Sequence, residues 1–168
     1  MGPAPAPMPL VIANYNPEWP GLFEKEAEAL RSAVPTLHAV EHIGSTAVPG
    51  MSARPTIDLL AGAADVHGVD ARALEGMGYA EAHRVGDREP GRRFFWRGTD
   101  AFPLYHLHVV IEDGDLWRRH LAFRDRLRAD PTFAERYAHH KRQLARQYAD
   151  DPEVYAEAKS TFIEAALS

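Results

Sequence analysis

The chain has 168 residues, of which 45% are hydrophobic and 26% charged, a composition typical of one folded globular domain. It contains no cysteine, which excludes disulfides, thiolate metal sites and a cysteine nucleophile. The net charge of −5 argues against binding to duplex nucleic acid, whose phosphates require Lys and Arg, and no apolar run approaches the ~18–20 residues of a membrane span.

The start of the chain alternates proline with small residues, which predicts a flexible arm over residues 1–9 ahead of a single domain over residues 10–168. Neither a basic stretch nor an apolar stretch of the kind found in signal peptides follows, so we expect a cytoplasmic protein. We expect no membrane partner. No pattern in the sequence fixes an oligomeric state.

Two helices are predicted in the first half of the chain. Asn16-Pro17-Glu18 combines a favoured N-cap with a proline at N1, and apolar residues recur at helical spacing from Trp19 to Val34. Asp70 to Met77 predicts a short helix that ends at Gly78. Strands are predicted where short apolar runs lie between turn residues, at residues 37–43, 55–60, 79–85, 93–97 and 102–111.

The last third of the chain is predicted to be helical. Three helices follow Asp115, and both Asp130-Pro131 and Asp151-Pro152 have the sequence of a capped helix start. The fold class that these elements predict is α+β, with a mixed β-sheet, flanking helices and a helical C-terminal third.

Positive charge is concentrated in one part of the chain. Between Arg84 and Arg146 there are 14 Lys and Arg against 9 Asp and Glu, whereas the remainder is acidic. This excess can attract an anionic substrate, such as a small molecule that carries phosphate, or it can belong to solvated helix faces.

The turn from Gly44 to Gly50 is the first candidate functional motif, because a predicted strand that contains Asp58 follows it. Glycine lets backbone N–H groups approach a phosphate, and Ser45 and Thr46 add hydroxyl donors. A carboxylate at Asp58 could hold Mg²⁺ between phosphates. The alternative is a tight turn in which backbone amides satisfy Asp58.

His106 and His108 form the second motif, since side chains two positions apart on a strand share one face. They either line a cleft or bind a metal, or they are hydrogen-bonded core residues. The aromatic run Phe94-Phe95-Trp96 is expected to pack against the sheet rather than to stack on bases.

Basic side chains on the predicted C-terminal helices complete the candidate set. Arg124 and Arg128 are four residues apart and share a helical face that fits a polyphosphate or pairs with nearby Asp residues. Tyr137 and Lys141 are also one turn apart, so they either face a cleft together or form an ordinary amphipathic pair.

With these motifs the chain resembles the GrpB family, bacterial proteins placed in the nucleotidyltransferase superfamily. The resemblance covers nearly everything after the proline-rich arm. Its most specific stretches are Tyr15 to Trp19, Glu41 to Gly50, Arg54 to Asp58, His106 to Val109 and Phe123 to Asp125. It implies a nucleotidyltransferase-like mixed sheet with helices packed on it and the Gly-Ser turn facing a phosphate-sized cleft.

The sequence departs from the superfamily pattern at its carboxylates. Gly44-Ser45 and Asp58 fit, but Leu60 stands where a second carboxylate is expected, and the later strand carries His106 and His108 instead of a third. One aspartate and two imidazoles are poor ligands for paired Mg²⁺ ions. They would better suit Zn²⁺, Mn²⁺ or Fe²⁺, with His42 joining them, or no metal and one histidine as a general base.

The leading hypothesis is a nucleotidyltransferase-like protein that binds a nucleotide or another phosphorylated small molecule. One alternative is a mononuclear metal enzyme acting through Asp58, His106 and His108, and another is a nucleotide-binding module without turnover. A divalent metal (Mg, Mn or Zn) is the cofactor considered for Asp58, His106, His108 and His42. The residues expected to bind substrate are Gly44, Ser45, Thr46, Arg54, Arg124, Tyr137 and Lys141.

Overall fold

The computed structural model describes residues 12–82, 91–98, 104–149 and 151–167. The helices are α1 (Trp19–Ala33), η1 (Ser45–Ala47), α2 (Ala71–Gly76), α3 (Asp115–Ala129), α4 (Pro131–Gln147) and α5 (Pro152–Leu167). The strands are β1 (Ala39–Ile43), β2 (Thr56–Ala63), β3 (Ala80–Ala82), β4 (Arg93–Arg97) and β5 (Leu104–Ile111). The flexible arm predicted for residues 1–9 lies outside the described residues.

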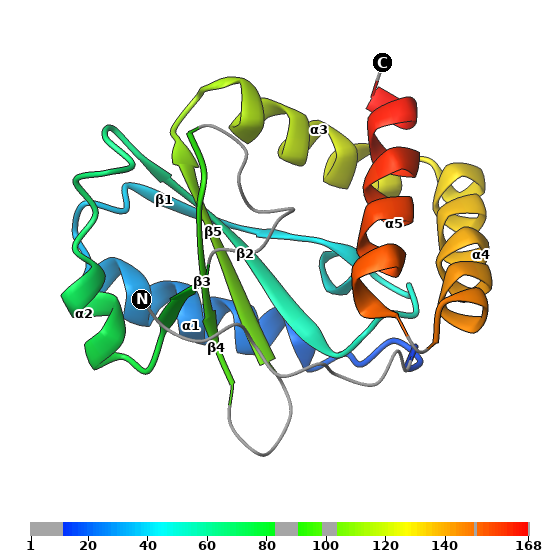
Figure 1. The fold of residues 1–168 in the computed structure, drawn as a ribbon, viewed down its shortest axis with the longest axis horizontal. Coiled ribbons are helices and arrows are strands. Elements are labelled where there is room, and N and C mark those ends of the chain that lie inside the picture. Colours follow the sequence, from blue (N-terminus) through cyan, green and yellow to red (C-terminus); the bar gives the residue numbers. More distant parts are fainter. Residues whose placement is uncertain (1–11, 83–90, 99–103, 150, 168) are drawn as a thin grey trace.

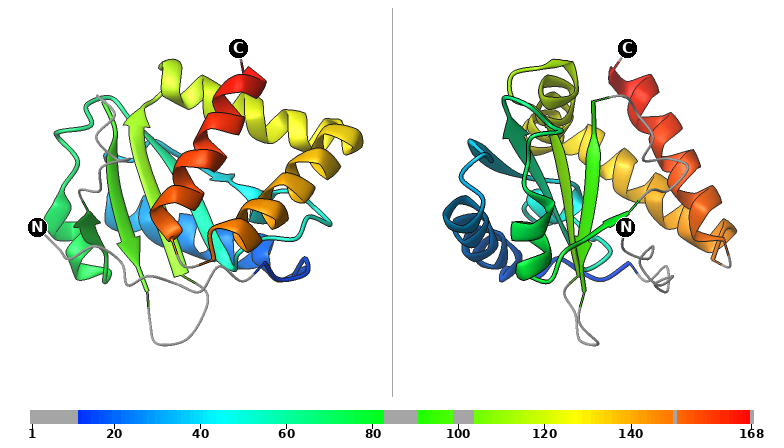
Figure 2. Two further views of the ribbon diagram at one scale, coloured as in Figure 1. Left: turned by 45° about the vertical axis from the view of Figure 1, so that its right-hand side comes forward. Right: turned by 60° about the vertical axis from the view of Figure 1, so that its left-hand side comes forward.

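The strands form one mixed sheet in the order β1-β2-β5-β4-β3. α1 and α2 lie on one face of this sheet, and α3, α4 and α5 lie on the other (Figure 1 and Figure 2). β2 and β5 pair in parallel, whereas the other neighbours are antiparallel. The predicted α+β class, with a mixed sheet and a helical final third, is confirmed.

Side chains alternate across the sheet and so build two cores. Leu59 and Leu107 face the helical layer of α1 and belong to the larger apolar cluster. Leu60 and Val110 point the other way and pack against Trp117 of α3. The candidate site lies on this second face.

The register of β2 against β5 positions the candidate residues. Asp58 pairs with His106, and Leu60 pairs with His108. On the other side of β5, the antiparallel strand β4 places Phe94 opposite His108. Both imidazoles therefore share the sheet face of Asp58, as the two-residue spacing of the histidines predicts.

Several predicted element boundaries differ from the observed ones, and β1 begins at Ala39, two residues after its predicted start. α1 begins at Trp19 and not at Pro17, because the Asn16 side chain accepts a hydrogen bond from the Glu18 amide at 2.9 Å in a turn that precedes the helix. β2 runs on to Ala63, three residues past its predicted end. β3 has three residues, and residues 83–85 of the predicted strand lie outside the described part of the chain.

Aspartate side chains cap the starts of α4 and α5 as predicted. Asp130 accepts a hydrogen bond from Phe133 N at 3.0 Å, and Asp151 accepts one from Val154 N at 3.2 Å. Asp70, for which no cap was predicted, likewise accepts hydrogen bonds from the first-turn amides of α2.

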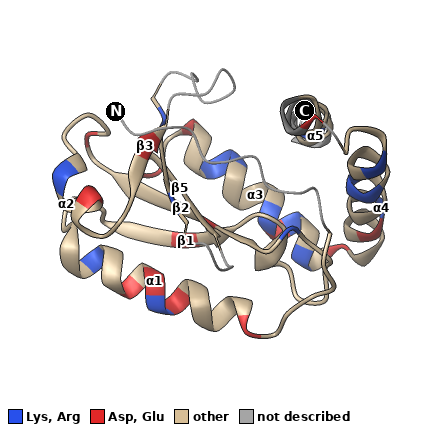
Figure 3. Ribbon diagram, turned by 60° about the horizontal axis from the view of Figure 1, so that its bottom comes forward, with Lys and Arg blue, Asp and Glu red and all other residues tan. Residues whose placement is uncertain are grey.

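Charge is distributed unevenly over the two helical layers. Lys and Arg are frequent along α3 and α4, while Asp and Glu are prominent on α1 (Figure 3). The basic excess in the second half of the sequence therefore lies on the face that carries Asp58. None of the helices in the described ranges is long and apolar enough to cross a membrane.

Candidate functional site

Asp58 is the centre of the candidate site. Its Oδ1 atom lies 3.3 Å from His108 Nε2 and 3.7 Å from His106 Nδ1. The three side chains retain between 13% and 23% of their exposure, so the group opens to the surface. The parallel pairing of β2 with β5 brings a carboxylate and two imidazoles from distant parts of the sequence into one cluster.

Asp58 is ionised at neutral pH. Burial acts to raise the pKa of its carboxyl, but the hydrogen bond from His108 and the charges of His106 and Lys159 outweigh burial and hold that pKa well below its usual range. An ionised carboxylate only accepts hydrogen bonds, so His108 Nε2 donates and Nδ1 is the basic nitrogen of its ring. The pair is thus arranged as a carboxylate that orients an imidazole base.

The Gly-Ser turn lies directly against Asp58. Gly44 has a φ of +77°, and a Cβ built on it would come 2.6 Å from Asp58 Oδ2. No other residue type fits both the backbone conformation and this close approach. Ser45 and Thr46 follow in the short helix η1, and both are buried.

Ser45 contacts a buried lysine from α4. Lys141 is 2% exposed, and its Nζ lies 2.6 Å from Ser45 Oγ and 2.8 Å from the Ser52 carbonyl oxygen. Tyr137, one turn earlier on α4, places its ring 5.1 Å from the same Nζ and hydrogen-bonds to Ser45. The structure therefore brings Ser45, Tyr137 and Lys141 together, as predicted for residues facing one site.

Lys141 is held close to neutrality by its surroundings. Burial, followed by the nearby charges of Lys159 and Arg142, lowers the pKa of its amine to about 6, against a smaller opposing effect of Asp58. Within the described part of the chain no carboxylate forms an ion pair with Lys141. A large fraction of the molecules therefore carries an uncharged amine here at neutral pH.

Two further residues lie at this site although neither was among the predicted site residues. His120 of α3 places its ring 6.1 Å from that of His108, and burial together with the charges of His108 and Arg92 lowers its pKa to about 3. Lys159 of α5 lowers the pKa of Asp58. The helical spacing of His120 from Trp117 is the signal that could have found it.

The structure does not bring His42 to this group. His42 pairs with Leu59 across β1 and β2, so its side chain lies on the opposite face of the sheet from Asp58. There it stacks on Phe23 at 4.7 Å, and its Nε2 lies 2.9 Å from Thr46 Oγ1. His42 therefore contacts Thr46 in the turn and does not lie beside Asp58 as a metal ligand.

The predicted arginines contact protein groups around the turn. Arg124 donates to Glu41 Oε2 at 2.7 Å, and Arg128 donates to the Ala47 carbonyl oxygen at 2.9 Å. Arg54 lies against the ring of Tyr155 at 5.9 Å. These contacts tie α3 and α5 to the segment around the Gly-Ser turn.

The donor set does not fit a pair of magnesium ions. Leu60, at the position of the expected second carboxylate, is fully buried in the apolar cluster with Trp117, and the group around Asp58 has one carboxylate. In the described ranges, no three or more His, Asp or Glu side chains are arranged to hold a metal ion.

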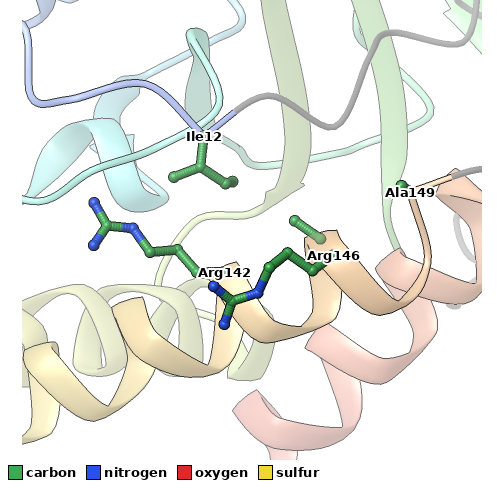
Figure 4. A pocket seen from close by; sticks show the side chains of 5 residues that line it. Ile12, Arg142, Arg146 and Ala149 are labelled. Atoms are coloured by element: carbon green, nitrogen blue, oxygen red, sulfur yellow. The ribbon is translucent and has the colours of Figure 1, made fainter.

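A separate hollow of about 520 Å³ lies beside α4 (Figure 4). Arg142 and Arg146, one helical turn apart, line it together with Ile12, Ala145 and Ala149. Arg142 also donates to Ser52 Oγ at 2.6 Å, so Ser52 lies between this hollow and Lys141.

Comparison with known proteins gives consistent matches over the whole described fold. The sequence profile of the GrpB protein family matches residues 9–168. The chain is 32% identical to the glutamate-rich protein GrpB of Alkalihalophilus pseudofirmus, over 95% of this chain and 94% of that protein. It is 36% identical to the UPF0157 protein YqkA of Bacillus subtilis, covering 92% of this chain but only 45% of that longer protein.

A solved structure has the same fold. The crystal structure of the conserved protein GrpB from Enterococcus faecalis superimposes with a TM-score of 0.79 at 34% sequence identity. The match covers 94% of this chain and 97% of that one.

Proposed function

The chain belongs to the GrpB protein family, and on this premise we propose that it binds a nucleotide or another phosphorylated small molecule in the manner of a nucleotidyltransferase. The observation that carries the proposal is the contact of the Gly44 turn with Asp58, whose carboxylate orients His108 at 3.3 Å. A turn that begins with a glycine and lies beside a carboxylate–imidazole pair is suited to phosphoryl or nucleotidyl transfer.

The positive charge around the turn supports a phosphorylated ligand. Lys141 and Lys159 lie near Asp58, and both α3 and α4 are rich in arginine. Ser45 would add a hydroxyl hydrogen bond to the phosphate of such a ligand.

In this proposal Asp58 and His108 act on the attacking hydroxyl. Asp58 accepts a hydrogen bond from His108 Nε2 and so orients the imidazole, which takes the proton of the acceptor hydroxyl as that oxygen attacks phosphorus. His106 lies 3.7 Å from the same carboxylate oxygen and helps to hold it ionised. General-base assistance of this kind contributes roughly 10²–10⁴ in rate.

Titration of the purified protein with inorganic phosphate, pyrophosphate and nucleoside mono-, di- and triphosphates tests the proposal. At least one of these should raise the melting temperature and bind saturably in calorimetry, because a ligand of the folded state stabilises it by mass action. Asp58→Asn should retain binding within about threefold and lose about 10²-fold or more in release of pyrophosphate or phosphate. No stabilisation by any member of the series would overturn the proposal.

The chain offers a matched control for Asp58. His38 Nδ1 and Glu112 Oε2 form another imidazole–carboxylate pair at 3.2 Å. Glu112 follows β5 at the end away from Asp58, six residues past His106, the pairing partner of Asp58, and so roughly 20 Å away at the rise of a β-strand. Glu112→Gln should leave both ligand binding and turnover unchanged.

A further inference from the structure

The contact between Lys141 and Ser45 has the geometry of a base and its nucleophile. Lys141 Nζ lies 2.6 Å from Ser45 Oγ, within the range in which a serine hydroxyl passes its proton to a base. The Ser52 carbonyl oxygen, 2.8 Å from Nζ, fixes the orientation of the amine. A serine activated by an adjacent base is the recurring arrangement of covalent catalysis.

The surroundings favour Lys141 as the base within this group. No carboxylate of the described residues pairs with Lys141, and burial, followed by the nearby charges of Lys159 and Arg142, lowers the pKa of its amine. Burial raises the pKa of Tyr137, so this phenol keeps its own proton at neutral pH. A neutral amine, which has a lone pair, can therefore take the proton of Ser45.

We propose that Ser45 is a covalent nucleophile that Lys141 activates toward the electrophilic phosphorus of a phosphate ester or anhydride. This inference rests on the proposed phosphate-binding function of the site, and it adds a phosphoserine or nucleotidyl-serine intermediate. Transfer would then occur in two displacements at one turn, without a pair of metal ions to bridge donor and acceptor.

The proposed transfer has two chemical steps. In the first step, the Ser45 Oγ–P bond forms, the bond from phosphorus to the leaving phosphate oxygen breaks, and the proton of the Ser45 hydroxyl passes to Lys141 Nζ. In the second, an acceptor hydroxyl gives its proton to His108, its oxygen bonds to phosphorus, and the Oγ–P bond breaks. Lys141 then returns its proton to Ser45 Oγ.

A fluorophosphonate probe tests the nucleophile without knowledge of the natural ligand. Its reaction forms the Oγ–P bond, breaks the P–F bond and releases fluoride, and the serine proton passes to Lys141. Intact mass and peptide mapping of the full chain should find one adduct, on Ser45. The labelling rate should rise with pH, reach half its maximum near the pKa of Lys141, which is about 6, and level off at higher pH.

Two substitutions of Lys141 separate a base from a structural contact. Lys141→Met removes the amine, and Lys141→Arg keeps a charged donor that cannot lose its proton. Both should slow labelling by about 100-fold or more. Recovery of labelling in Lys141→Arg would show that Lys141 only positions Ser45, and would overturn the proposal.

Ser45→Ala removes the hydroxyl and should abolish the adduct. Circular dichroism and melting curves first establish that each variant is folded, and the two Lys141 variants test the proposal if Ser45→Ala is unfolded. Ser32 is an exposed serine on α1, so Ser32→Ala should leave the adduct unchanged. An unlabelled Ser45 in a protein that still binds nucleotides would overturn the nucleophile but not the proposed function. Labelling of Ser45 without binding of any phosphate compound would support the nucleophile and overturn the proposed phosphate ligand.

Discussion

Gly44 and Asp58 are in direct contact across the Gly-Ser turn. The missing side chain of Gly44 leaves the space that Asp58 Oδ2 occupies, since a Cβ there would come 2.6 Å from that oxygen. The turn and the carboxylate therefore hold each other in place. The position of the acid in the candidate site depends on the one residue type that has no side chain.

Gly44→Ala should destabilise the protein more than Gly50→Ala does. Both glycines have a positive φ, of +77° and +81°, but a Cβ at Gly50 meets nothing within 4 Å. Gly50→Ala should cost about 1 kcal/mol from backbone strain alone, and Gly44→Ala about 1–3 kcal/mol more, because Asp58 must shift. Urea unfolding measures both.

The same experiment in an Asp58→Ala background isolates the contact. Once the carboxylate is removed, the extra cost of Gly44→Ala over Gly50→Ala should fall, because only the Cβ of residue 58, at 3.1 Å, is left in close contact. An extra cost that stays unchanged in this background would show that the Asp58 carboxylate is not its cause.

The sequence predicts the main acid–base group but not all of its members. The spacing of His106 and His108 is enough to place both imidazoles on one face, because strand periodicity is local. Asp58 and His106 are neighbours only because β2 and β5 pair in a particular parallel register, and no short sequence pattern encodes that register. His42 illustrates the limit, since only the β1 register shows that it faces away from Asp58.

Contacts between distant parts of the chain were the least predictable. Ser45 and Lys141 are 96 positions apart, and only the packing of α4 over the turn brings them together. Arg124 and Arg128 share a helical face as expected, yet that face binds Glu41 and the Ala47 carbonyl oxygen. Sequence spacing identifies such residues and cannot name their partners.

Arg124 should prove to be a stabilising residue rather than a ligand contact. Its guanidinium is 11% exposed and joins α3 to Glu41 of β1 at 2.7 Å. Arg124→Ala should lower the free energy of unfolding by about 1–3 kcal/mol, because it removes charge-assisted hydrogen bonds. Affinity for the phosphate compound found in titration should change less than about threefold. A tenfold loss of affinity with unchanged stability would show direct contact with the ligand.

Mild acid should destabilise the fold through His42. Burial lowers the pKa of its imidazole to about 4, against 6.5 for the unfolded chain. The unfolded state therefore binds more protons between these values, and stability that is present above pH 6.5 is lost as the pH falls toward 4.

A His42→Gln variant measures this effect, because it cannot gain the proton. Between pH 7 and pH 4.5 the natural protein should lose about 2 kcal/mol more than the variant, by denaturant unfolding at each pH. Parallel losses in the two proteins would show that His42 does not carry the acid sensitivity. His120, whose pKa is also lowered, is present in both and cancels in the comparison.

Restoring a carboxylate at Leu60 should unfold the protein rather than create a magnesium site. Leu60 is fully buried and packs with Ile43, Val110 and Trp117. Leu60→Asp should cost about 3–5 kcal/mol, because it buries an unpaired charge and loses apolar contacts. Leu60→Met, which conserves volume, should cost less than about 1.5 kcal/mol.

Melting curves of the two variants with and without millimolar Mg²⁺ provide the measurement. A folded Leu60→Asp variant that Mg²⁺ stabilises, where the natural protein shows no response, would mean that this position can still accept a metal ligand.

The parallel pairing of β2 with β5 also links the site to the folding of the whole chain. Asp58 and His108 are 50 positions apart, and α2, β3 and β4 all lie between them in the sequence. A loop of that length must close before the two side chains meet, so the pair assembles only with the central sheet. The backbone amide protons of Asp58 and His108 should exchange with solvent only through global unfolding. Any change that destabilises the central sheet will therefore also separate the two side chains.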